Sequence, residues 1–461
     1  MSAYATINPA TGEALAEFPV ISDREVDTIL DRAHTAYLSW RKTPLTQRTA
    51  ALARAAQLCT ERIDELARLL TLEMGKPLMQ AQGEVMIVAS IFQYYAENAE
   101  KFLADEVLEA VGGGEAVVRT EPIGVVLGVM PWNFPYYQVA RFAAPNLALG
   151  NTIVLKHARN CPQSALAMEK LLHDAGIPTD AYINAFIDSR QVAEVIADPR
   201  VQGVSLTGSE KAGSAVGEVA GRHMKRYVLE LGGSDPFIVL EDADIDAAVQ
   251  EAVMGRVLNA GQACTASKRF IVVDSVYDEF TQKFIGAMTQ ISTGDPADPA
   301  TLIGPLSSAQ AAEDLGEIVK DAVDKGAELH SAPQPTGGSA YYAPGVLTGV
   351  TPEMRAFSEE LFGPVATVYR VPSPQAAVQL ANSSPFGLGS SIFTKNLDLA
   401  RDLAGDLETG MVWINAVTGS SAELPFGGVK RSGVGRELGK YGMSEFANKK
   451  LVRVPQPVSA H

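Results

Sequence analysis

The sequence predicts an α/β protein with more than one domain. Short apolar segments alternate with helix-like segments from Ile123 to about residue 240, and the alternation returns between about 240 and 440. This pattern is typical of parallel sheets covered by helices on both faces. A chain of 461 residues is also too long for a single hydrophobic core. We therefore expect two α/β domains.

The first hundred residues favour helices. Gly75-Lys76-Pro77 interrupts the helical pattern and separates the second expected helix from the third. After a glycine-rich turn, the pattern changes to a strand over 116–120. The expected helices of this region, where apolar residues recur at helical spacing, are 24–40, 46–71 and 78–104.

The first alternating region has helix-boundary signals. Gly150 and Gly176 stand where a helix C-terminal glycine is expected, and Pro162 suits the first turn of a helix. The expected strands are 124–130, 152–156, 182–187, 201–206 and 226–230. The expected helices are 136–149, 163–175, 190–197 and 209–222.

The second alternating region repeats this pattern and ends in an isolated strand. Residues Lys449 to Val454 form a strand with no partner beside it in the sequence, so we expect it to pair elsewhere, within the chain or across subunits. The other expected elements are strands 237–240, 269–273 and 365–370, and helices 244–258, 276–290 and 308–325.

Composition excludes several classes of function. The formal charge is −16, which disfavours nonspecific binding to nucleic acid or to an anionic membrane. No apolar segment approaches the roughly 18 residues of a membrane span, and no signal peptide is evident. The histidines are scattered without metal-ligand spacing, so no metal site is expected. Cys59, Cys161 and Cys264 form no CxxC pair, which fits a reducing, cytoplasmic location.

Two glycine-containing motifs supply a nucleophile and a base. Glu230 begins Glu-Leu-Gly-Gly, and Cys264 ends Gly-Gln-Ala-Cys. A thiolate attacks a carbonyl carbon well, and a carboxylate can activate the water that releases the resulting thioester. The alternatives are an inert buried cysteine and a structural carboxylate.

Three further motifs lie at strand ends or turns. Thr207-Gly208-Ser209 at a strand-to-helix junction suits a phosphate, or Ser209 only caps the helix. Pro131-Trp132-Asn133-Phe134-Pro135 presents an amide that could stabilise an oxyanion, unless Asn133 is only a turn residue. Glu359-Glu360-Leu361-Phe362-Gly363-Pro364 is either functional or a charged turn before a strand.

Taken together with Leu155-Lys156 and the segment 425–439, PFGGVKRSGVGRELG, these motifs resemble the NAD(P)-dependent aldehyde dehydrogenase superfamily over nearly the whole chain. The resemblance implies that Cys264 is the nucleophile, that Glu230 is the base for hydrolysis, and that Asn133 holds the oxyanion with the Cys264 backbone N–H. It also implies a set of residues that bind the cofactor: Trp132, Lys156, Gly208, Ser209, Leu231, Glu360 and Phe362.

Two positions depart from the common pattern of that family. Arg159 stands where many NAD-preferring relatives carry a glutamate that holds the ribose hydroxyls. A guanidinium there can bind a 2′-phosphate, so we expect NADP to be used at least as well as NAD, unless Arg159 points to solvent. Phe142 replaces a lysine of many relatives, which removes a proton relay through that lysine.

The substrate motifs favour an aldehyde with a distal carboxylate. Arg141 follows Asn133 by two helical turns, and Ser420-Ser421 precedes the PFGG segment. Succinate-semialdehyde dehydrogenases resemble this chain at these positions, so Arg141, Ser420 and Ser421 are expected to bind the carboxylate. Leu258 replaces a second arginine of that group, and Arg141 alternatively pairs with an acidic neighbour. The competing functions are a broad-range or other-substrate aldehyde dehydrogenase and a non-enzymatic protein with a retained fold.

The resemblance further implies the aldehyde dehydrogenase fold in three parts. A Rossmann-like cofactor domain is expected over 1–102 and 123–229, and a catalytic α/β domain over 230–439. A small β oligomerisation extension is expected over 103–122 and 440–461. Because exposed strand edges usually need a partner, we expect a homodimer or a homotetramer.

Overall fold

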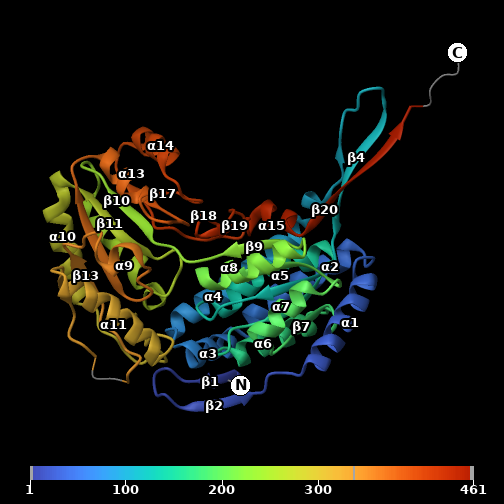
Figure 1. Ribbon diagram of the computed structural model, residues 1–461, viewed down its shortest axis with the longest axis horizontal. Coiled ribbons are helices and arrows are strands. Elements are labelled where there is room, and N and C mark those ends of the chain that lie inside the picture. The colour runs from blue at the N-terminus through green and yellow to red at the C-terminus, as the bar shows by residue number, and fades with distance from the viewer. Residues whose placement is uncertain (1–3, 336–337, 457–461) are drawn as a thin grey trace.

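The computed structural model describes residues 4–335 and 338–456. Two large sheets lie beside each other, and a narrow β extension projects from the region of the first (Figure 1). The predicted α/β fold class is confirmed by the parallel strands of both large sheets and the helices that cover them.

The N-terminal segment contains a hairpin that the sequence patterns did not indicate. Strands β1 (Tyr4–Ile7) and β2 (Ala14–Phe18) pair antiparallel. The prediction of a single helix over 46–71 is wrong, because the helix is interrupted at Arg62, where φ is −113° and ψ is 22°. The helices of this segment are α1 (Asp23–Trp40), α2 (Leu45–Glu61), α3 (Ile63–Met74) and α4 (Leu78–Leu103).

The first large sheet has the order β19-β9-β8-β5-β6-β7, in which β19 alone is antiparallel to its neighbour. Its strands are β5 (Val125–Val129), β6 (Thr152–Lys156), β7 (Tyr182–Asn184), β8 (Val201–Thr207), β9 (Arg226–Glu230) and β19 (Gly433–Val434). Strands β6 and β9 have the predicted bounds. The strand order reverses between β5 and β8, which is where ligands bind in open α/β sheets.

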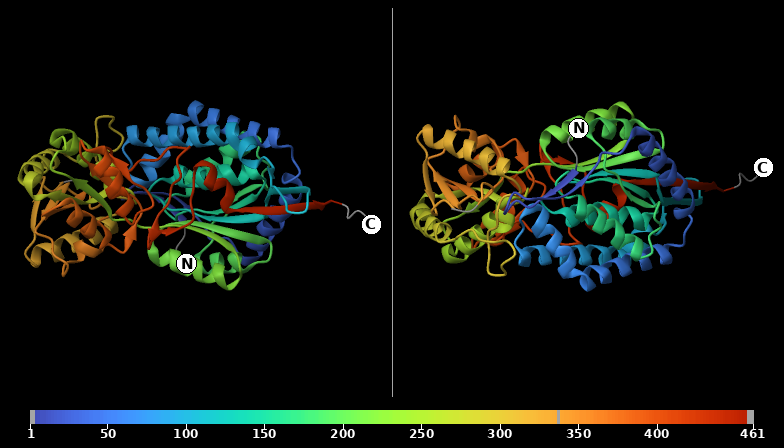
Figure 2. Two further views of the ribbon diagram at one scale, coloured as in Figure 1. Left: turned by 90° about the horizontal axis from the view of Figure 1, so that it is seen from above. Right: turned by 90° about the horizontal axis from the view of Figure 1, so that it is seen from below.

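Helices cover both faces of this first sheet, as the two views of Figure 2 show. Helices α2, α4, α5 and α6 share one apolar core with it, whereas α1, α7 and α8 share another. The helices that follow its strands are α5 (Pro135–Leu149), α6 (Pro162–Asp174), α7 (Ser189–Ala197) and α8 (Glu210–Arg222). This two-sided packing explains why the strands are nearly continuous runs of apolar residues.

The second large sheet has the order β12-β13-β14-β11-β10-β16-β17, with β12 antiparallel at one edge. Its strands are β10 (Asp235–Val239), β11 (Ser267–Val273), β12 (Glu328–Ser331), β13 (Gly345–Thr348), β14 (Val365–Val371), β16 (Ser391–Phe393) and β17 (Trp413–Ile414). Its helices are α9 (Ile245–Val257), η1 (Leu258–Gly261), α10 (Asp274–Thr289), α11 (Ala309–Asp324), α12 (Arg355–Ser358), α13 (Pro374–Asn382) and α14 (Leu397–Asp406). Stacked Phe237 and Phe393, with ring centroids 4.3 Å apart, lie in its core.

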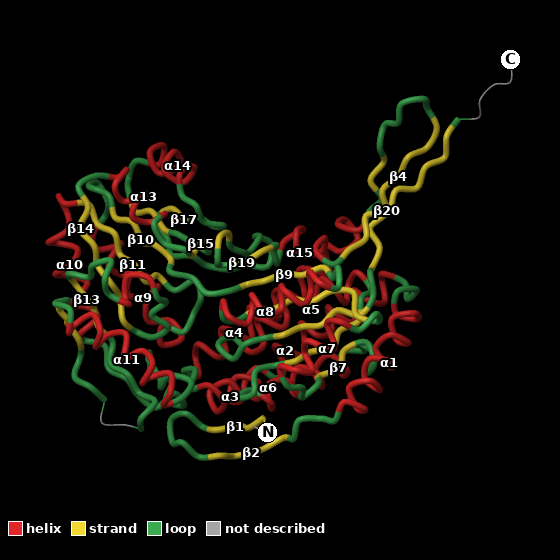
Figure 3. The backbone as a smooth tube through the Cα atoms, viewed as in Figure 1, coloured by secondary structure: helices red, strands yellow, loops and turns green. Residues whose placement is uncertain are grey.

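The β extension contains the strand that had no sequential partner. Strand β20 (Ala447–Pro455) pairs along its length with β4 (Gly114–Pro122) of the same chain, and β3 (Glu106–Val107) adds a short third strand. The strands project well beyond the helices, as the tube in Figure 3 shows. Residues 457–461 of the predicted extension lie outside the described residues.

The remaining C-terminal elements connect the two large sheets. Strand β15 (Phe386–Gly387) pairs with β18 (Val429–Lys430), and α15 (Gly439–Glu445) leads into β20. Strand β19 belongs to the sequence range 230–439 but pairs with β9 of the first sheet. The three-part domain division therefore stays a prediction, and a single cut after residue 229 does not separate the two sheets.

Candidate active site

A cleft of about 250 Å³ lies between the two large sheets. The loop after β5 and the loop after β8 both border it, as expected at the point where the strand order reverses. Predicted site residues from five separate motifs meet there. They are Trp132, Asn133, Gly208, Ser209, Leu231, Cys264, Glu360 and Phe362.

Asn133 lines this cleft and contacts the segment that leads to the predicted nucleophile, Cys264. Its side-chain Nδ2 donates to the Gln262 carbonyl oxygen at 3.1 Å, and its own carbonyl accepts from Asn259 Nδ2 at 2.9 Å. Since an amide nitrogen carries two protons, the bond to Gln262 leaves a second proton for a developing oxyanion. The position of Asn133 therefore suits an oxyanion hole.

The turn that leads to Cys264 has an unusual backbone. Asn259, Ala260 and Gly261 take positive φ angles of 53°, 53° and 76° in succession. Buried Arg256 holds this turn, because its Nη2 donates to the Gly261 carbonyl at 2.7 Å and its Nη1 to the Ser267 carbonyl at 3.2 Å. Arg256 is therefore a structural residue of the loop that carries Cys264. It does not take the place of the arginine that Leu258 replaces.

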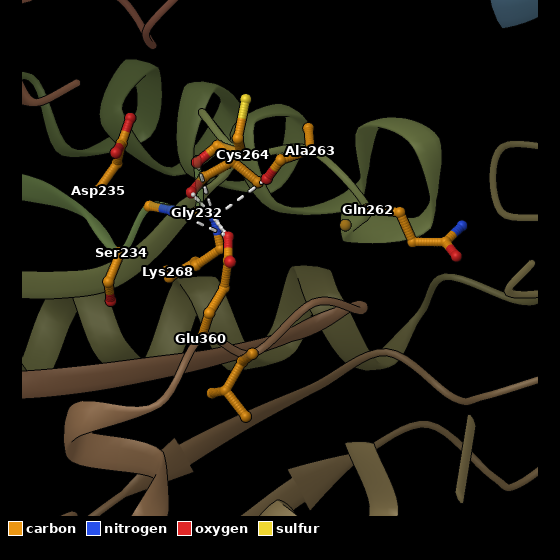
Figure 4. Close-up of polar contacts among 12 residues, drawn as sticks. Gly232, Ser234, Asp235, Gln262, Ala263, Cys264, Lys268 and Glu360 are labelled. Atoms are coloured by element: carbon orange, nitrogen blue, oxygen red, sulfur yellow. Dashed lines mark hydrogen bonds and ion pairs between the residues drawn. The ribbon is translucent and has the colours of Figure 1, made fainter. Parts of the chain in front are cut away.

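Lys268 holds carbonyl groups at and directly before the predicted nucleophile Cys264. Its Nζ donates to the carbonyl oxygens of Ala263 at 3.0 Å and Cys264 at 2.9 Å, and it pairs with Glu360 Oε1 at 3.0 Å. Figure 4 shows the Cys264 sulfur pointing away from these contacts. The backbone of the loop is thus anchored while the sulfur remains free to react.

Two opposing effects act on the pKa of the Cys264 thiol. Burial raises the pKa of the Cys264 thiol to about 12, while the positive charges of Arg141 and Lys268 act to lower it. A thiol with this pKa is a weak nucleophile at neutral pH. Attack therefore requires a base or a closer positive charge when substrate and cofactor are bound.

Glu230 ends β9 and is almost completely buried. Neither carboxylate oxygen has a hydrogen-bond partner among the described residues. Burial raises the pKa of Glu230 well above its usual value, and the charge of Arg141 opposes that rise. Gly427 leaves space for the side chain, because a Cβ at that position would lie 2.7 Å from Glu230 Oε1. A raised pKa and free oxygens suit a general base.

Arg141 lies on α5 and is fully buried. It pairs with Glu437 and donates to the Tyr137 hydroxyl and to Thr207 Oγ1, each at 3.3 Å. Its guanidinium also covers the Phe426 ring at 4.3 Å. The acidic neighbour foreseen as the alternative for Arg141 is therefore present, and it is Glu437.

The predicted cofactor residues of the cleft combine packing with polar contacts. The rings of Trp132 and Phe362 meet edge to face with centroids 5.7 Å apart. Ser209 Oγ caps α8 by accepting from the Ala212 N–H at 3.3 Å, so the capping role expected as the alternative exists beside the cleft position. Glu360 Oε1 accepts from the Gly233 N–H at 3.2 Å. A dinucleotide fits this arrangement, because the rings of Trp132 and Phe362, the N-cap residue Ser209 of α8 and the Glu360 carboxylate all border the same cleft.

Lys156 and Arg159 lie apart from the residues that line the 250 Å³ cleft. Lys156 ends β6, and its pKa is lowered to about 8, first by burial and then by the charge of nearby Arg159. Lys156 and Arg159 are both half-buried. Arg159 is therefore neither fully exposed to solvent nor part of the core. The two residues form a positive region just beyond the C-terminal end of β6.

A second cavity, of about 320 Å³, includes Ser420 and Phe426 in its lining. Ser420 Oγ lies 2.6 Å from the Tyr137 hydroxyl, which in turn accepts from Arg141. The Ser421 hydroxyl is buried without a partner among the described residues. Arg141, Tyr137 and the two serines thus form a polar cluster beside this cavity.

Sequence reasoning missed Lys268, Tyr137 and Glu437. Lys268 carried one usable signal, because a lysine in a strand that continues into the apolar run Phe270 to Val273 needs buried acceptors. Glu437 and Tyr137 carried none, since their roles come from contacts with residues far away in the chain.

The described residues carry neither a metal-binding cluster nor a membrane-spanning helix. Residues 4–335 and 338–456 contain no group of three or more His, Cys, Asp or Glu side chains placed to hold a metal ion. Within the same ranges, none of the helices has the length and apolar character that crossing a membrane requires.

Comparison with known proteins places the chain among enzymes of one family. The model of the aldehyde dehydrogenase family matches residues 1–452. The chain is 56% identical to a succinate-semialdehyde dehydrogenase [NADP(+)] of Deinococcus radiodurans, over 98% of this chain and 94% of that protein. It is 46% identical to succinate-semialdehyde dehydrogenase [NADP(+)] 1 of Mycobacterium tuberculosis, over 97% and 99% of the two chains.

Solved structures agree with these relatives. The succinic semialdehyde dehydrogenase of Streptococcus pyogenes, solved with NADP+ as the cofactor, superposes with a TM-score of 0.96. It is 44% identical to this chain, and the alignment covers 98% of this chain and all of the other.

Proposed function

This chain belongs to the aldehyde dehydrogenase family, and we propose that it oxidises succinate semialdehyde to succinate with NADP⁺ through a thiohemiacetal and a thioester on Cys264. One observation carries the proposal. Cys264 and Asn133 line the same cleft, and the unpaired carboxylate of Glu230 lies close enough for its charge to raise the pKa of Cys264. A nucleophile, an oxyanion donor and a base are thus within reach of one carbonyl group.

The proposed reaction begins at the Cys264 sulfur. The thiolate adds to the aldehyde carbon, and the carbonyl oxygen becomes an alkoxide held by Asn133 Nδ2 and the Cys264 N–H. Bound NADP⁺ supplies the acceptor for the hydride that leaves this carbon, so that a thioester remains on Cys264. Glu230 then takes a proton from water, whose oxygen attacks the thioester carbon. The C–S bond breaks, and the carboxylic acid is released.

The cofactor residues support NADP. Gly208 and Ser209 stand at the N-terminus of α8, where backbone N–H groups favour a pyrophosphate. Trp132, Leu231 and Phe362 supply apolar walls, and Glu360 supplies a carboxylate for ribose hydroxyls. We place Lys156 at the adenosine ribose and Arg159 at the 2′-phosphate, because the two positive charges lie close together beyond β6. NAD is expected to bind less tightly, since it offers Arg159 no phosphate.

The distal carboxylate of the substrate is assigned to the cluster of Arg141, Ser420 and Ser421, with Tyr137 between them. The Ser421 hydroxyl has no partner among the described residues, and Ser420 shares a hydroxyl pair with Tyr137. Arg141 supplies positive charge behind this pair. Replacing Arg141 by alanine is expected to raise KM for succinate semialdehyde far more than KM for a neutral aldehyde of similar length.

A broad-range aldehyde dehydrogenase is the second candidate, and one observation favours it. Arg141 already pairs with Glu437, so part of its charge is neutralised before substrate arrives. Steady-state kinetics across semialdehydes and neutral aldehydes, with both cofactors, separates the two. Equal kcat/KM for succinate semialdehyde and a neutral aldehyde would establish the broad-range enzyme. A strong preference for NAD over NADP would show that Arg159 does not bind the 2′-phosphate.

We further propose a cytoplasmic homodimer or homotetramer. The three cysteines are free, as expected in a reducing compartment. Strand β20 is an edge of its sheet, and Leu451 and Val454 on it are more than half exposed. Such an edge usually pairs or is covered. Light scattering of the purified protein gives the oligomeric state, and a monomer at micromolar concentration would contradict the proposed assembly.

A further inference from the structure

Lys76 is a buried lysine in the turn between α3 and α4, far in sequence from every catalytic motif. Its side chain is 1% exposed, and it pairs with Glu84 of α4, which is equally buried. Burial lowers the pKa of Lys76, while the Glu84 carboxylate opposes that change. A buried ion pair is weak evidence of stabilisation, because taking both charges out of water offsets their attraction. The contacts of the Lys76–Glu84 pair therefore indicate a role other than stabilising the fold.

The contacts of this pair converge on the loop that carries Asn133. Lys76 Nζ donates to the Asn133 carbonyl oxygen at 2.9 Å and lies 3.7 Å from the centre of the Phe134 ring. Glu84 Oε1 accepts from the N–H groups of Tyr136, at 2.8 Å, and Tyr137, at 3.1 Å. The first turn of α5 has no side-chain cap of its own, so Glu84 takes over this function.

One ion pair thus holds both sides of the loop. Lys76 fixes the carbonyl of Asn133, while Glu84 fixes the start of the helix that follows. Asn259 reaches the same Asn133 carbonyl from the nucleophile side, at 2.9 Å. The backbone that carries the Asn133 amide is therefore held by donors from two segments, the turn between α3 and α4 and the 3-10 helix η1.

The backbone of the turn is shaped to bring Lys76 to this place. Gly75 ends α3 with φ +76°, which favours glycine. A Cβ there would also meet Pro305 at 2.7 Å, so the turn packs closely against the second sheet's side of the molecule. Pro77 then restarts the chain as α4. Lys76 is thereby directed inward at the junction of two helices.

We propose that Lys76, together with Glu84, is a positioning residue that orients the Asn133 amide toward the alkoxide formed on the substrate. This inference rests on the proposed role of Asn133. Oxyanion donors act through exact placement, and a displacement of about 1 Å can reduce the rate about 100-fold. Removing the pair should slow the formation of the thioester without weakening cofactor binding, because neither residue lines the cofactor cleft.

The test uses a charge-balanced variant, Lys76→Met with Glu84→Gln, which leaves no unpaired buried charge. The single-turnover rate of reduced-cofactor formation is expected to fall about 10- to 100-fold, with the dissociation constant for NADP⁺ within about twofold of the parent. In an Asn133→Ala background, the same two substitutions should produce no further loss. A parental rate in the charge-balanced variant, or an equal further loss without Asn133, would overturn the proposal.

The matched control is Glu73→Gln on α3. Glu73 is as buried as Glu84, but its carboxylate accepts from Thr6, Gln163 and Ser164 rather than from residues of the Asn133 loop. This control should lower the thermal midpoint to a similar degree and retain the parental single-turnover rate. A rate loss in the control equal to that of the charge-balanced variant would mean general destabilisation, and would also overturn the proposal.

A second variant keeps the test informative if the first does not fold. Asn259→Gly removes the other donor to the Asn133 carbonyl and tolerates the φ of 53° at that position. It leaves the Lys76–Glu84 pair intact, and a rate loss that disappears in the Asn133→Ala background is expected. A parental rate would overturn the positioning of Asn133 through its carbonyl. A parental rate in Asn133→Ala alone would instead remove the proposed oxyanion role.

Discussion

The proposed nucleophile, Cys264, and the proposed general base, Glu230, are held in opposite ways. The Cys264 loop is anchored by Lys268 and Arg256, which together bind carbonyl groups before and after Cys264 in the chain. Glu230 ends a strand, yet its carboxylate has no hydrogen-bond partner among the described residues. One group is fixed through its backbone, and the other is left free at its reactive end.

The difference matches the order of the chemical steps. The sulfur must approach a carbonyl carbon from one direction, so a rigid loop lowers the entropy lost on reaching the transition state. The carboxylate acts only after the hydride has left, and it must then reach a water molecule. Freedom of the Glu230 side chain, in the space left by Gly427, is therefore part of the proposed mechanism.

Removing the anchored nucleophile should have the largest effect. Cys264→Ala is expected to reduce aldehyde turnover on the order of 10⁴-fold or more, because no other thiol lines the cleft. Binding of NADP⁺, measured by fluorescence titration, should stay within about twofold of the parent. Turnover at the parental rate would rule out Cys264 as the nucleophile.

Loosening the nucleophile loop should have the next largest effect. Lys268→Met removes donors to Ala263 and Cys264 and the partner of Glu360, so kcat is expected to fall about 100-fold. Arg269→Met is the matched control, because the adjacent buried Arg269 instead binds the carbonyls of Ser234, Leu380 and Ala381. Similar kcat values for the two variants would remove the special role of Lys268.

Restricting the general base should slow hydrolysis alone. Gly427→Ala would place a methyl group against Glu230 Oε1 at a position whose φ is +152°. Steady-state turnover is expected to fall about 10-fold, while the first turnover of reduced cofactor keeps its rate. Rapid-mixing absorbance separates the two phases, and an equal loss in both phases would show a wider distortion of the site.

The smallest expected effect is a change in pH dependence. Glu230 acts as a base only when deprotonated, and burial raises its pKa, so hydrolysis should speed up as pH rises through that raised value. Arg141 lowers the pKa of Glu230, and Arg141→Met should therefore move the rising limb of the profile to higher pH. If the pH midpoint of this rising limb is the same in the variant and the parent, the charge of Arg141 does not affect the pKa of Glu230.

Local sequence patterns were sufficient to predict those helices and strands whose characteristic residues lie within the element or directly beside it. Strands β6 and β9 were predicted to the residue, because each is a short apolar run beside a turn. The break at Arg62 was missed, since neither glycine nor proline marks it. Family resemblance, confirmed by the family match, identified the motifs that border the cleft.

What could not be predicted depends on contacts between distant segments. Lys76 was visible only as part of a helix break, and its contact with the Asn133 carbonyl requires the folded loop. Glu437 was visible only as part of a glycine-rich motif, although it pairs with Arg141 in the core. Burial and pairing of charged residues are properties of the tertiary structure, so they leave no local periodicity.

The most direct test of the division between a fixed nucleophile and a free base is a rapid-mixing experiment with Glu230→Gln. This substitution keeps the size of the side chain and removes its basicity. The account predicts a rapid burst of a single equivalent of reduced cofactor per active site, followed by turnover on the order of 10³-fold slower than the parent. Steady turnover at the parental rate, or the absence of a burst, would contradict it.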